Sequence, residues 1–236
     1  PAFAQSGELV FTLDSSGPRP AVMISLGGRP DERWVVDTGA GGSVISETRA
    51  RALGLPNLGP ARVGSPAGGA PVEAFRTRIA GATIDGATLP EFDAVAVPMP
   101  PQLDHSGVLS PNTFRGRLVL FNFPHDQMRV IGRADMPAGD GTPYLVGLPA
   151  LTVRVGEQTH QAHMDTGAPH LVSFPYALAS SLPLVGPPQR VGVARFVDGE
   201  HTRYRAQLNG RVELGPLTVM NPEIGMIEGL PFVNVG

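Results

Sequence analysis

Two aspartates occupy the same four-residue setting at distant points of this 236-residue sequence, Asp37-Thr38-Gly39-Ala40 and Asp165-Thr166-Gly167-Ala168. Two carboxylates held a few ångströms apart cannot both ionise at low cost, so they share one proton and titrate as a unit. A water held between them can lose a proton to the charged partner while the protonated partner polarises a carbonyl group. The two aspartates are therefore candidates for hydrolysis that needs no metal, cofactor or covalent nucleophile.

The sequence around the two motifs is also repeated. A single Asp-Thr-Gly is typical of an ordinary turn, in which the aspartate bonds its own backbone. Here each copy follows a predicted apolar strand, at residues 20–26 and 148–155. Each is then followed by a predicted short helix, at 47–53 and 174–182, the first placed to be capped by Ser46. A shared order of elements on this scale indicates a duplicated unit.

The repeat predicts two β-rich lobes and a linker. We expect an N-terminal lobe at residues 1–131, a Gly- and Asp-rich linker at 132–143, and a C-terminal lobe at 144–236. The first lobe has an additional predicted strand pair, 118–121 and 127–131. The second lobe reaches Gly236 without a counterpart of this pair.

With these residues in place, the sequence resembles the retropepsin-like aspartic proteases in their bacterial single-chain, two-lobed form. The resemblance covers about residues 21–236 and rests on the two motifs, the helix after each, and the short apolar segments 107–110 and 233–236. It implies a mainly β, pseudo-twofold acid-protease fold of two closed barrels, with one short helix per lobe. It also implies an aspartic endopeptidase acting on peptide or protein substrates.

The resemblance assigns roles to the motif residues. Asp37 and Asp165 would be the catalytic carboxylates. In each loop the threonine would bond to the opposite loop and the glycine would let backbone come close to the carboxylates; the supporting residues are Thr38, Gly39, Ala40, Thr166, Gly167 and Ala168. Pepsin-like enzymes usually carry a hydroxyl residue where this chain has alanine. We therefore expect a pH optimum between mildly acidic and neutral, because alanine cannot bond a carboxylate and favour its ionisation.

Two predicted hairpins follow the motifs and would act as flaps. They span residues 62–75 and 196–204, with tips at Gly68-Gly69 and Asp198-Gly199. A flap closes over an extended peptide and adds strand-like hydrogen bonds to it. The alternative interpretation is that both are ordinary exposed turns.

Composition excludes several other classes of function. The net charge is −3, and all eighteen basic residues are scattered arginines, which argues against nucleic-acid binding. The absence of cysteine excludes disulfides and thiol nucleophiles, and no apolar stretch is long enough to span a membrane. Ala2-Phe3-Ala4 has the form of a signal-peptidase site, so we expect a periplasmic or secreted protein, with a cytoplasmic one as the alternative. The linker is long enough for pairing of the lobes within a monomer, the alternative being a swapped dimer.

Other chemical motifs are weaker. His160 and His163 have metal-ligand residue types, but on a strand these positions face opposite sides, so no metal site is expected. Residues 39–43 are glycine-rich but lack the lysine of a phosphate-binding loop. Residues 104–106 (Asp-His-Ser) are adjacent in sequence and cannot form a catalytic relay, so we expect them in a solvated loop.

The main rival hypothesis is a catalytically silent protein of the same fold that binds a peptide or partner in its cleft. Three departures from the family pattern support it. Ser110 replaces an expected glycine, His163-Met164 replaces two aliphatic residues before Asp165, and the second lobe reaches Gly236 with no counterpart of the first lobe's extra strand pair.

Overall fold

A computed structural model describes residues 8–64, 70–100, 103–132, 144–145, 148–168, 170–196 and 199–236. Ala2-Phe3-Ala4 and all of the predicted linker except its first residue lie outside these ranges. The chain divides into two compact units. Unit 1 comprises residues 1–62 and 73–140, and unit 2 comprises residues 63–72 and 141–236, so the break after residue 140 falls within the predicted linker.

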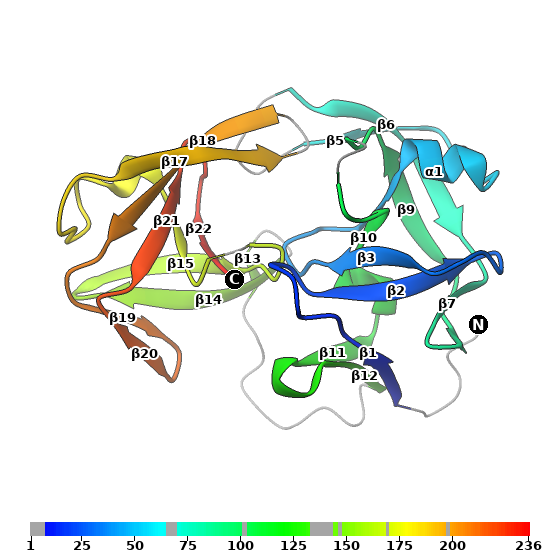
Figure 1. Cartoon of the computed structure of the whole chain (residues 1–236), viewed down its shortest axis with the longest axis horizontal. Helices are drawn as coiled ribbons and strands as arrows, with labels where there is room; N and C mark the ends of the chain where they lie inside the picture. Colours follow the sequence, from blue (N-terminus) through cyan, green and yellow to red (C-terminus); the bar gives the residue numbers. More distant parts are fainter. Residues whose placement is uncertain are drawn as a thin grey trace. The chain divides into compact units, whose positions relative to one another are not determined.

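Unit 1 is built on a nine-stranded sheet and a separate three-stranded sheet (Figure 1). In spatial order the larger sheet consists of β5 (Pro60–Val63), β6 (Val72–Ile79), β9 (Phe92–Val97), β4 (Ser43–Ser46), β10 (Gly107–Leu109), β3 (Glu32–Val36), β2 (Ala21–Leu26), β7 (Ala82–Ile84) and β8 (Ala87–Thr88). The smaller sheet consists of β1 (Leu9–Thr12), β12 (Gln127–Gly132) and β11 (Arg117–Asn122). The strand pair predicted at 118–121 and 127–131 is therefore confirmed, as β11 and β12.

Unit 2 is built on one ten-stranded sheet. In spatial order it consists of β17 (Gln189–Phe196), β18 (Gly199–Gln207), β21 (Glu223–Ile227), β16 (Ser173–Pro175), β22 (Val233–Val235), β15 (Gln158–Met164), β14 (Leu148–Val155), β19 (Arg211–Leu214) and β20 (Leu217–Met220). A short strand, β13 (Tyr144–Leu145), pairs with β14 outside this path.

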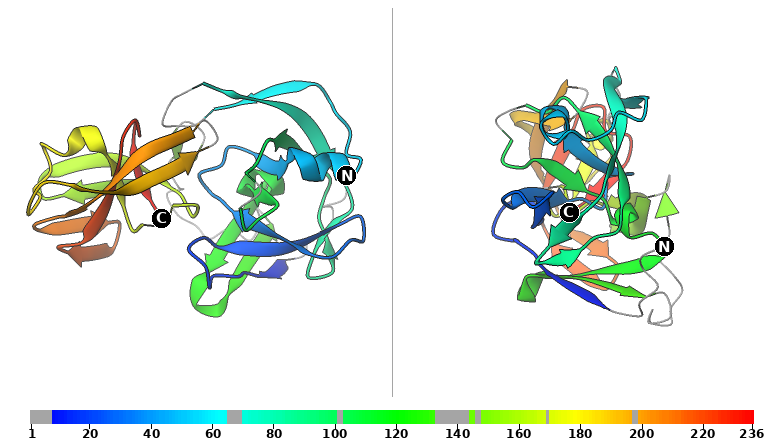
Figure 2. Two further views of the ribbon diagram at one scale, coloured as in Figure 1. Left: turned by 45° about the horizontal axis from the view of Figure 1, so that its top comes forward. Right: turned by 90° about the vertical axis from the view of Figure 1, so that its right-hand side faces the viewer.

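The spatial order of strands confirms the internal repeat. Position by position, the path from β5 to β8 in unit 1 matches the path from β17 to β20 in unit 2. The directions match as well: β3 runs parallel to β10 as β15 does to β22, and β4 runs parallel to β9 as β16 does to β21. The strands of both units are strongly twisted (Figure 2). The prediction of a mainly β, two-lobed protein is correct.

The helices differ between the two copies. In unit 1 the predicted helix is present as α1 (Glu47–Ala52) after Ser46, although the Ser46 side chain makes no capping hydrogen bond within the described part of the chain. In unit 2 the expected α-helix is replaced by a 3₁₀ turn, η4 (Tyr176–Leu178), preceded by Pro175 at the end of β16. Because β16 continues to Pro175 and Pro183 follows soon after, little chain is left for a longer helix. The described residues include no helix with the length and apolar character of a membrane span.

Each unit has its own hydrophobic core. In unit 1 the core is formed around Trp34, Phe11 and Phe114, each no more than 1% exposed. In unit 2 it is formed around Phe174 and Met226, both fully buried. Burying a large apolar side chain contributes about 1.5–3 kcal/mol to the free energy of folding. Since the two cores are separate, the strands of each unit are stabilised by apolar contacts within that unit.

Gly107 allows the largest side chain of unit 1 to pack against the strand beside it. A Cβ atom added at Gly107 would lie 2.6 Å from the Trp34 ring and 2.6 Å from the carbonyl oxygen of Val44. Gly107 is paired with Trp34 across β10 and β3 and with Ile45 across β10 and β4. The missing side chain therefore lets three strands close over the indole ring.

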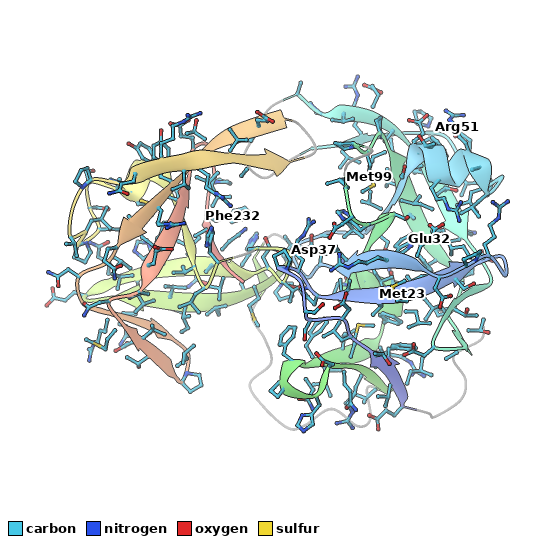
Figure 3. The ribbon with its side chains drawn as sticks, viewed as in Figure 1. Met23, Glu32, Asp37, Arg51, Met99 and Phe232 are labelled. Carbon is cyan, nitrogen blue, oxygen red and sulfur yellow. The ribbon has the colours of Figure 1, made fainter. Side chains whose placement is uncertain are left out.

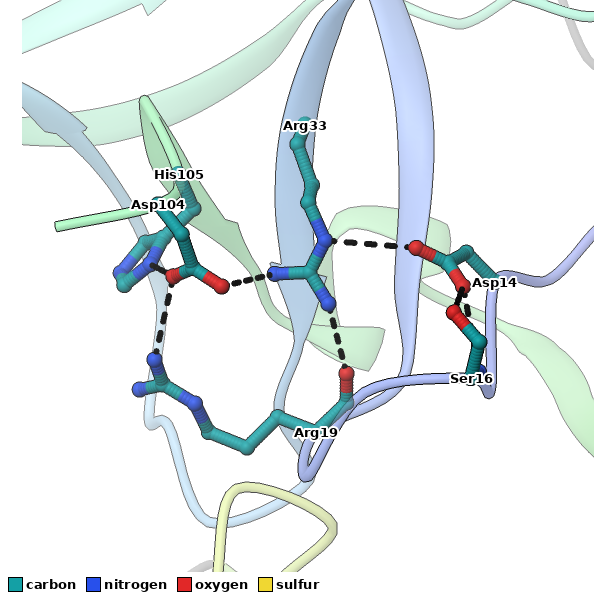
Figure 4. A network of polar contacts seen from close by, with 6 residues as sticks. All are labelled: Asp14, Ser16, Arg19, Arg33, Asp104 and His105. Atoms are coloured by element: carbon teal, nitrogen blue, oxygen red, sulfur yellow. Dashed lines mark hydrogen bonds and ion pairs between the residues drawn. The ribbon is translucent and has the colours of Figure 1, made fainter.

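A polar network supports the same strands at the protein surface (Figure 4). Arg33 of β3 donates to Asp104 (3.1 Å), to the carbonyl oxygen of Arg19 (2.9 Å) and to Asp14 (3.4 Å). Asp104 also bonds the Nδ1 atom of His105 at 2.9 Å. The His105 side chain is only 3% exposed, so the expected solvated loop is wrong for this residue. It is buried because it leads into β10, one of the central strands.

Protonation acts against this network. The hydrogen bond from His105 lowers the pKa of Asp104, and burial lowers the pKa of His105. For both groups the folded state binds protons less readily than the unfolded state. Their contributions to stability are therefore present above the unfolded pKa values and are lost as the pH falls.

We predict that Gly107→Ala destabilises unit 1 by about 1–3 kcal/mol, because the new methyl group collides with Trp34 and with backbone. Urea unfolding followed by tryptophan fluorescence measures this, since Trp34 is the single tryptophan. The control is Gly64→Ala, where the added methyl group meets no described atom within 4 Å. Equal losses in the two variants would contradict the packing argument.

We predict that the thermal stability of the protein decreases as the pH falls from about 7 to 5, through the usual histidine pKa of about 6.5. In His105→Asn this decrease is shallower, because a titrating buried group has been removed. Melting temperatures across that pH range measure the slope. His125→Asn, at an exposed histidine, serves as the control and retains the original slope. An unchanged slope in His105→Asn would exclude His105 as the source.

Candidate functional site

The first motif forms a tight turn at the end of β3, where Asp37 is labelled in Figure 3. The backbone N–H of Asp37 donates to the carbonyl oxygen of Leu109 in β10, at 3.1 Å. The N–H of Gly39 donates to the Oδ1 atom of Asp37 at 2.7 Å, and that of Ala40 donates to the Asp37 carbonyl oxygen at 3.4 Å. Thr38 is buried, at 9% exposure, whereas Asp37 is half-buried. The carboxylate is thus fixed by its own turn and by the neighbouring parallel strand.

The second motif repeats this geometry in unit 2. The N–H of Asp165 donates to the carbonyl oxygen of Val235 in β22, at 2.7 Å. The N–H of Gly167 donates to the Oδ1 atom of Asp165 at 2.9 Å, and that of Ala168 donates to the Asp165 carbonyl oxygen at 2.9 Å. All four residues of this motif are half-buried. Each lobe therefore presents one partly exposed aspartate from an equivalent turn.

Ser110, a departure from the family pattern, stabilises the first motif loop. Its hydroxyl donates to the carbonyl oxygen of Ala40 at 2.8 Å and accepts from the N–H of Asn112 at 3.2 Å. Its own N–H donates to the hydroxyl of Ser43 at 3.0 Å, and that hydroxyl lies 2.7 Å from the Thr113 hydroxyl. Ser110 is fully buried. The serine therefore supplies hydrogen bonds to the loop at the position where a glycine was expected.

Unit 2 has the expected glycine at the equivalent position. A Cβ atom on Gly236 would lie 2.2 Å from the carbonyl oxygen of Ala168 and 2.8 Å from that of His170. The N–H of Gly236 instead donates to the His170 carbonyl oxygen at 3.2 Å. The two motif loops thus reach similar conformations by different means, a serine hydroxyl in unit 1 and a close backbone approach in unit 2.

One residue at the second motif, Asn234, was not predicted from the sequence. Its Nδ2 atom donates to the Oδ2 atom of Asp165 at 2.8 Å. Asn234 lies in β22 between Val233 and Val235, within a segment interpreted from sequence only as a short apolar run. The signal that could have identified it is a lone amide inside that run, because a buried polar group requires a partner.

The structure describes part of each predicted flap. β5 lies beside β6 at one edge of its sheet, and β17 pairs with β18 at the equivalent edge. Gly68, Gly69 and Asp198 lie outside the described residues. Gly199 is described as the first residue of β18, paired with Phe196. The two hairpins are confirmed as strand pairs, and their role as flaps stays a prediction.

The histidines near the second motif contact different aromatic rings. His160 packs edge-on against Phe174 at 5.5 Å, whereas His163 packs on Phe232 at 3.8 Å between ring centroids. Phe232 is labelled in Figure 3. Burial lowers the pKa of His160 and also that of His170. Among the described residues no group of three metal-ligating side chains is close enough together to hold an ion.

A hollow of about 640 Å³ lies beside the first motif loop, within unit 1. Gly41, Gly42 and Asn112 line it on the motif side, and Arg76 and Arg78 of β6 line it on another. Arg78 is paired with the neighbouring Asp93 at 2.8 Å. The recess therefore connects the loop that follows Asp37 with the strand that continues into the first hairpin.

We predict that Ser110→Ala costs about 1–3 kcal/mol of stability, because it leaves buried partners in the first motif loop without their hydrogen bonds. Urea unfolding measures the loss. Ser181→Ala is the matched control, since its hydroxyl bonds the Leu178 carbonyl oxygen at 3.0 Å in an exposed position. We expect less than about 0.5 kcal/mol there. A similarly small effect at Ser110 would show that its hydroxyl does not hold the loop.

Residues 22–112 and 151–234 match the sequence profile of the family described as aspartyl protease. No curated protein matches the chain. Among solved structures, a retropepsin-like aspartic protease from Rickettsia conorii is similar at 16% identity and a TM-score of 0.37, over 53% of this chain and 91% of that one. Since the family match spans most of both motif-bearing halves, the chain belongs to the aspartyl protease family.

Proposed function

We propose that the chain is an aspartic endopeptidase in which Asp37 and Asp165 together activate the water that hydrolyses a peptide bond. One observation carries this proposal. In each lobe an aspartate lies in an equivalent turn, directly after the equivalent strand of the nine-strand path, and accepts a glycine N–H on its Oδ1 atom. A duplicated turn of this kind would serve a reaction that uses one carboxylate from each copy.

The chemistry needs only the two carboxylates and water. The water oxygen bonds to the carbonyl carbon as one of its protons passes to the ionised aspartate, while the protonated aspartate gives its proton to the carbonyl oxygen. The C–N bond of the tetrahedral intermediate then breaks as a proton moves to the leaving nitrogen. The glycine N–H bonds favour a charged, oriented carboxylate in each loop. Aspartic proteases are the established example of two carboxylates sharing a proton.

The remaining parts of the proposal concern the surroundings of the two aspartates. Thr38 and Thr166 would bond across to the opposite loop, and the two hairpins would close over an extended peptide. A single chain would provide both aspartates. The peptide would add to the hairpin edges β5 and β17, each of which lies at the end of its strand path.

We predict that Asp37→Asn and Asp165→Asn each lower peptide cleavage by about 10²–10⁴-fold, because each removes one proton-transfer group at nearly constant shape. Cleavage of a peptide library followed by mass spectrometry measures this. Asp31→Asn, at an exposed aspartate, is the control and retains activity. The wild-type pH–rate profile should peak between mildly acidic and neutral pH.

The rival hypothesis gives a different result in the same experiment. A catalytically silent protein would bind peptides without cleaving them. Any trace of cleavage in its preparation would be insensitive to both substitutions. Either result would overturn the assignment as a protease.

A further inference from the structure

Asn234 lies where a purely structural residue would be apolar. It is 7% exposed, in the middle of β22, and is paired with His163 of β15 and Ser173 of β16. Its Oδ1 atom is buried and has no hydrogen-bond partner among the described residues. An amide with one unpaired oxygen is unfavourable in a core, so packing alone does not account for it.

The favourable bond of this amide is the one to Asp165. The carboxylate accepts from the Gly167 N–H on Oδ1 at 2.9 Å and from Asn234 Nδ2 on Oδ2 at 2.8 Å. Donors on both oxygens fix the plane of the carboxylate. They also favour its charged form, because an ionised carboxylate accepts a hydrogen bond on either oxygen, whereas a proton on one oxygen weakens that oxygen as an acceptor.

The two lobes differ at this position. In unit 1 the residue equivalent to Asn234 is Val108, in β10, which has no polar side-chain atom. The glycine bond to Oδ1 is common to both lobes, at 2.7 Å in unit 1. The amide donor is therefore an asymmetric addition to a duplicated turn.

We propose that Asn234 is a positioning residue that keeps Asp165 ionised, so that Asp165 takes the proton from the attacking water and Asp37 is the proton-bearing partner. This assignment rests on the proposed protease function. The water O–H proton passes to Asp165, the new bond forms between the water oxygen and the carbonyl carbon, and the Asp37 proton passes to the carbonyl oxygen.

Other titratable groups on the neighbouring elements could also change the pH dependence of activity. His163 of β15 lies two residues before Asp165 and packs on Phe232, and His170 lies in the loop after the motif. Burial is the main cause that lowers the pKa of His170, and the charges of Arg203 and Arg205 lower it further. The charge of Glu223 raises it. β22 and β16 carry no titratable side chain. His163→Gln is therefore used as a second background.

The first test is Asn234→Leu, which removes the donor at similar volume. We expect the acidic limb of the kcat/KM profile to move up by about one pH unit, which lowers activity about tenfold below that limb. The same movement is expected in the His163→Gln background. Asn209→Leu, at an exposed asparagine, is the control and leaves the limb in place. A merely structural role would lower kcat/KM equally at every pH, and either that result or movement of the basic limb alone would overturn the proposal.

The second test does not depend on turnover. Side-chain carboxyl carbons of Asp37 and Asp165 are titrated by NMR in the wild type and in the exchanged variant Val108→Asn/Asn234→Val. We expect Asp165 to ionise at lower pH than Asp37 in the wild type and the order to reverse in the exchanged variant. An unchanged order would overturn the role of Asn234. If the wild type does not cleave peptides, the proposed function fails, whereas the titration order still decides whether Asn234 favours ionised Asp165.

Discussion

The pairing of two parallel strands is the constraint on which both motif turns depend. In each lobe the strand that leads into the aspartate runs beside a short strand, β10 or β22, whose last carbonyl oxygen accepts the aspartate N–H. Parallel neighbours place the ends of both strands at one edge of the sheet, so the turn leaves the sheet with its direction already set. The glycine N–H then orients the carboxylate. The strand pairing sets the position of each motif loop. The Ser110 hydrogen bonds and the close backbone approach at Gly236 then fix the conformation of the loop.

In unit 1 this pairing has two further supports. In unit 1 the strands close over Trp34 because Gly107 has no side chain, and the Arg33 network holds the chain that leads into β10. That network includes a buried histidine and a carboxylate whose pKa values are both lowered. The contribution of this network to the stability of unit 1 is therefore present while His105 is neutral, and it is lost as the pH falls.

Much of this fold could be predicted from the sequence, because each strand pattern and turn motif occurs in both copies of the repeat. Strand 148–155 was predicted at its observed bounds, since its apolar alternation has no competing interpretation. The second helix was wrong because two prolines confine the segment, which local helix propensity does not show. His105 was misplaced because a polar tripeptide looks solvated, whereas its burial depends on strands distant in sequence. Asn234 was missed for the same reason: its partner is far away in the chain and close only in the fold.

The match between the two strand paths has a consequence for how such a protein can diversify. An assembly of two identical polypeptides must place the same residue on both sides of its axis, so asparagine would accompany both aspartates or neither. When both copies lie on one chain they can differ, and here Val108 stands in one copy where Asn234 stands in the other. A duplicated chain can therefore give its two aspartates different neighbours without any change in the strand framework that holds them.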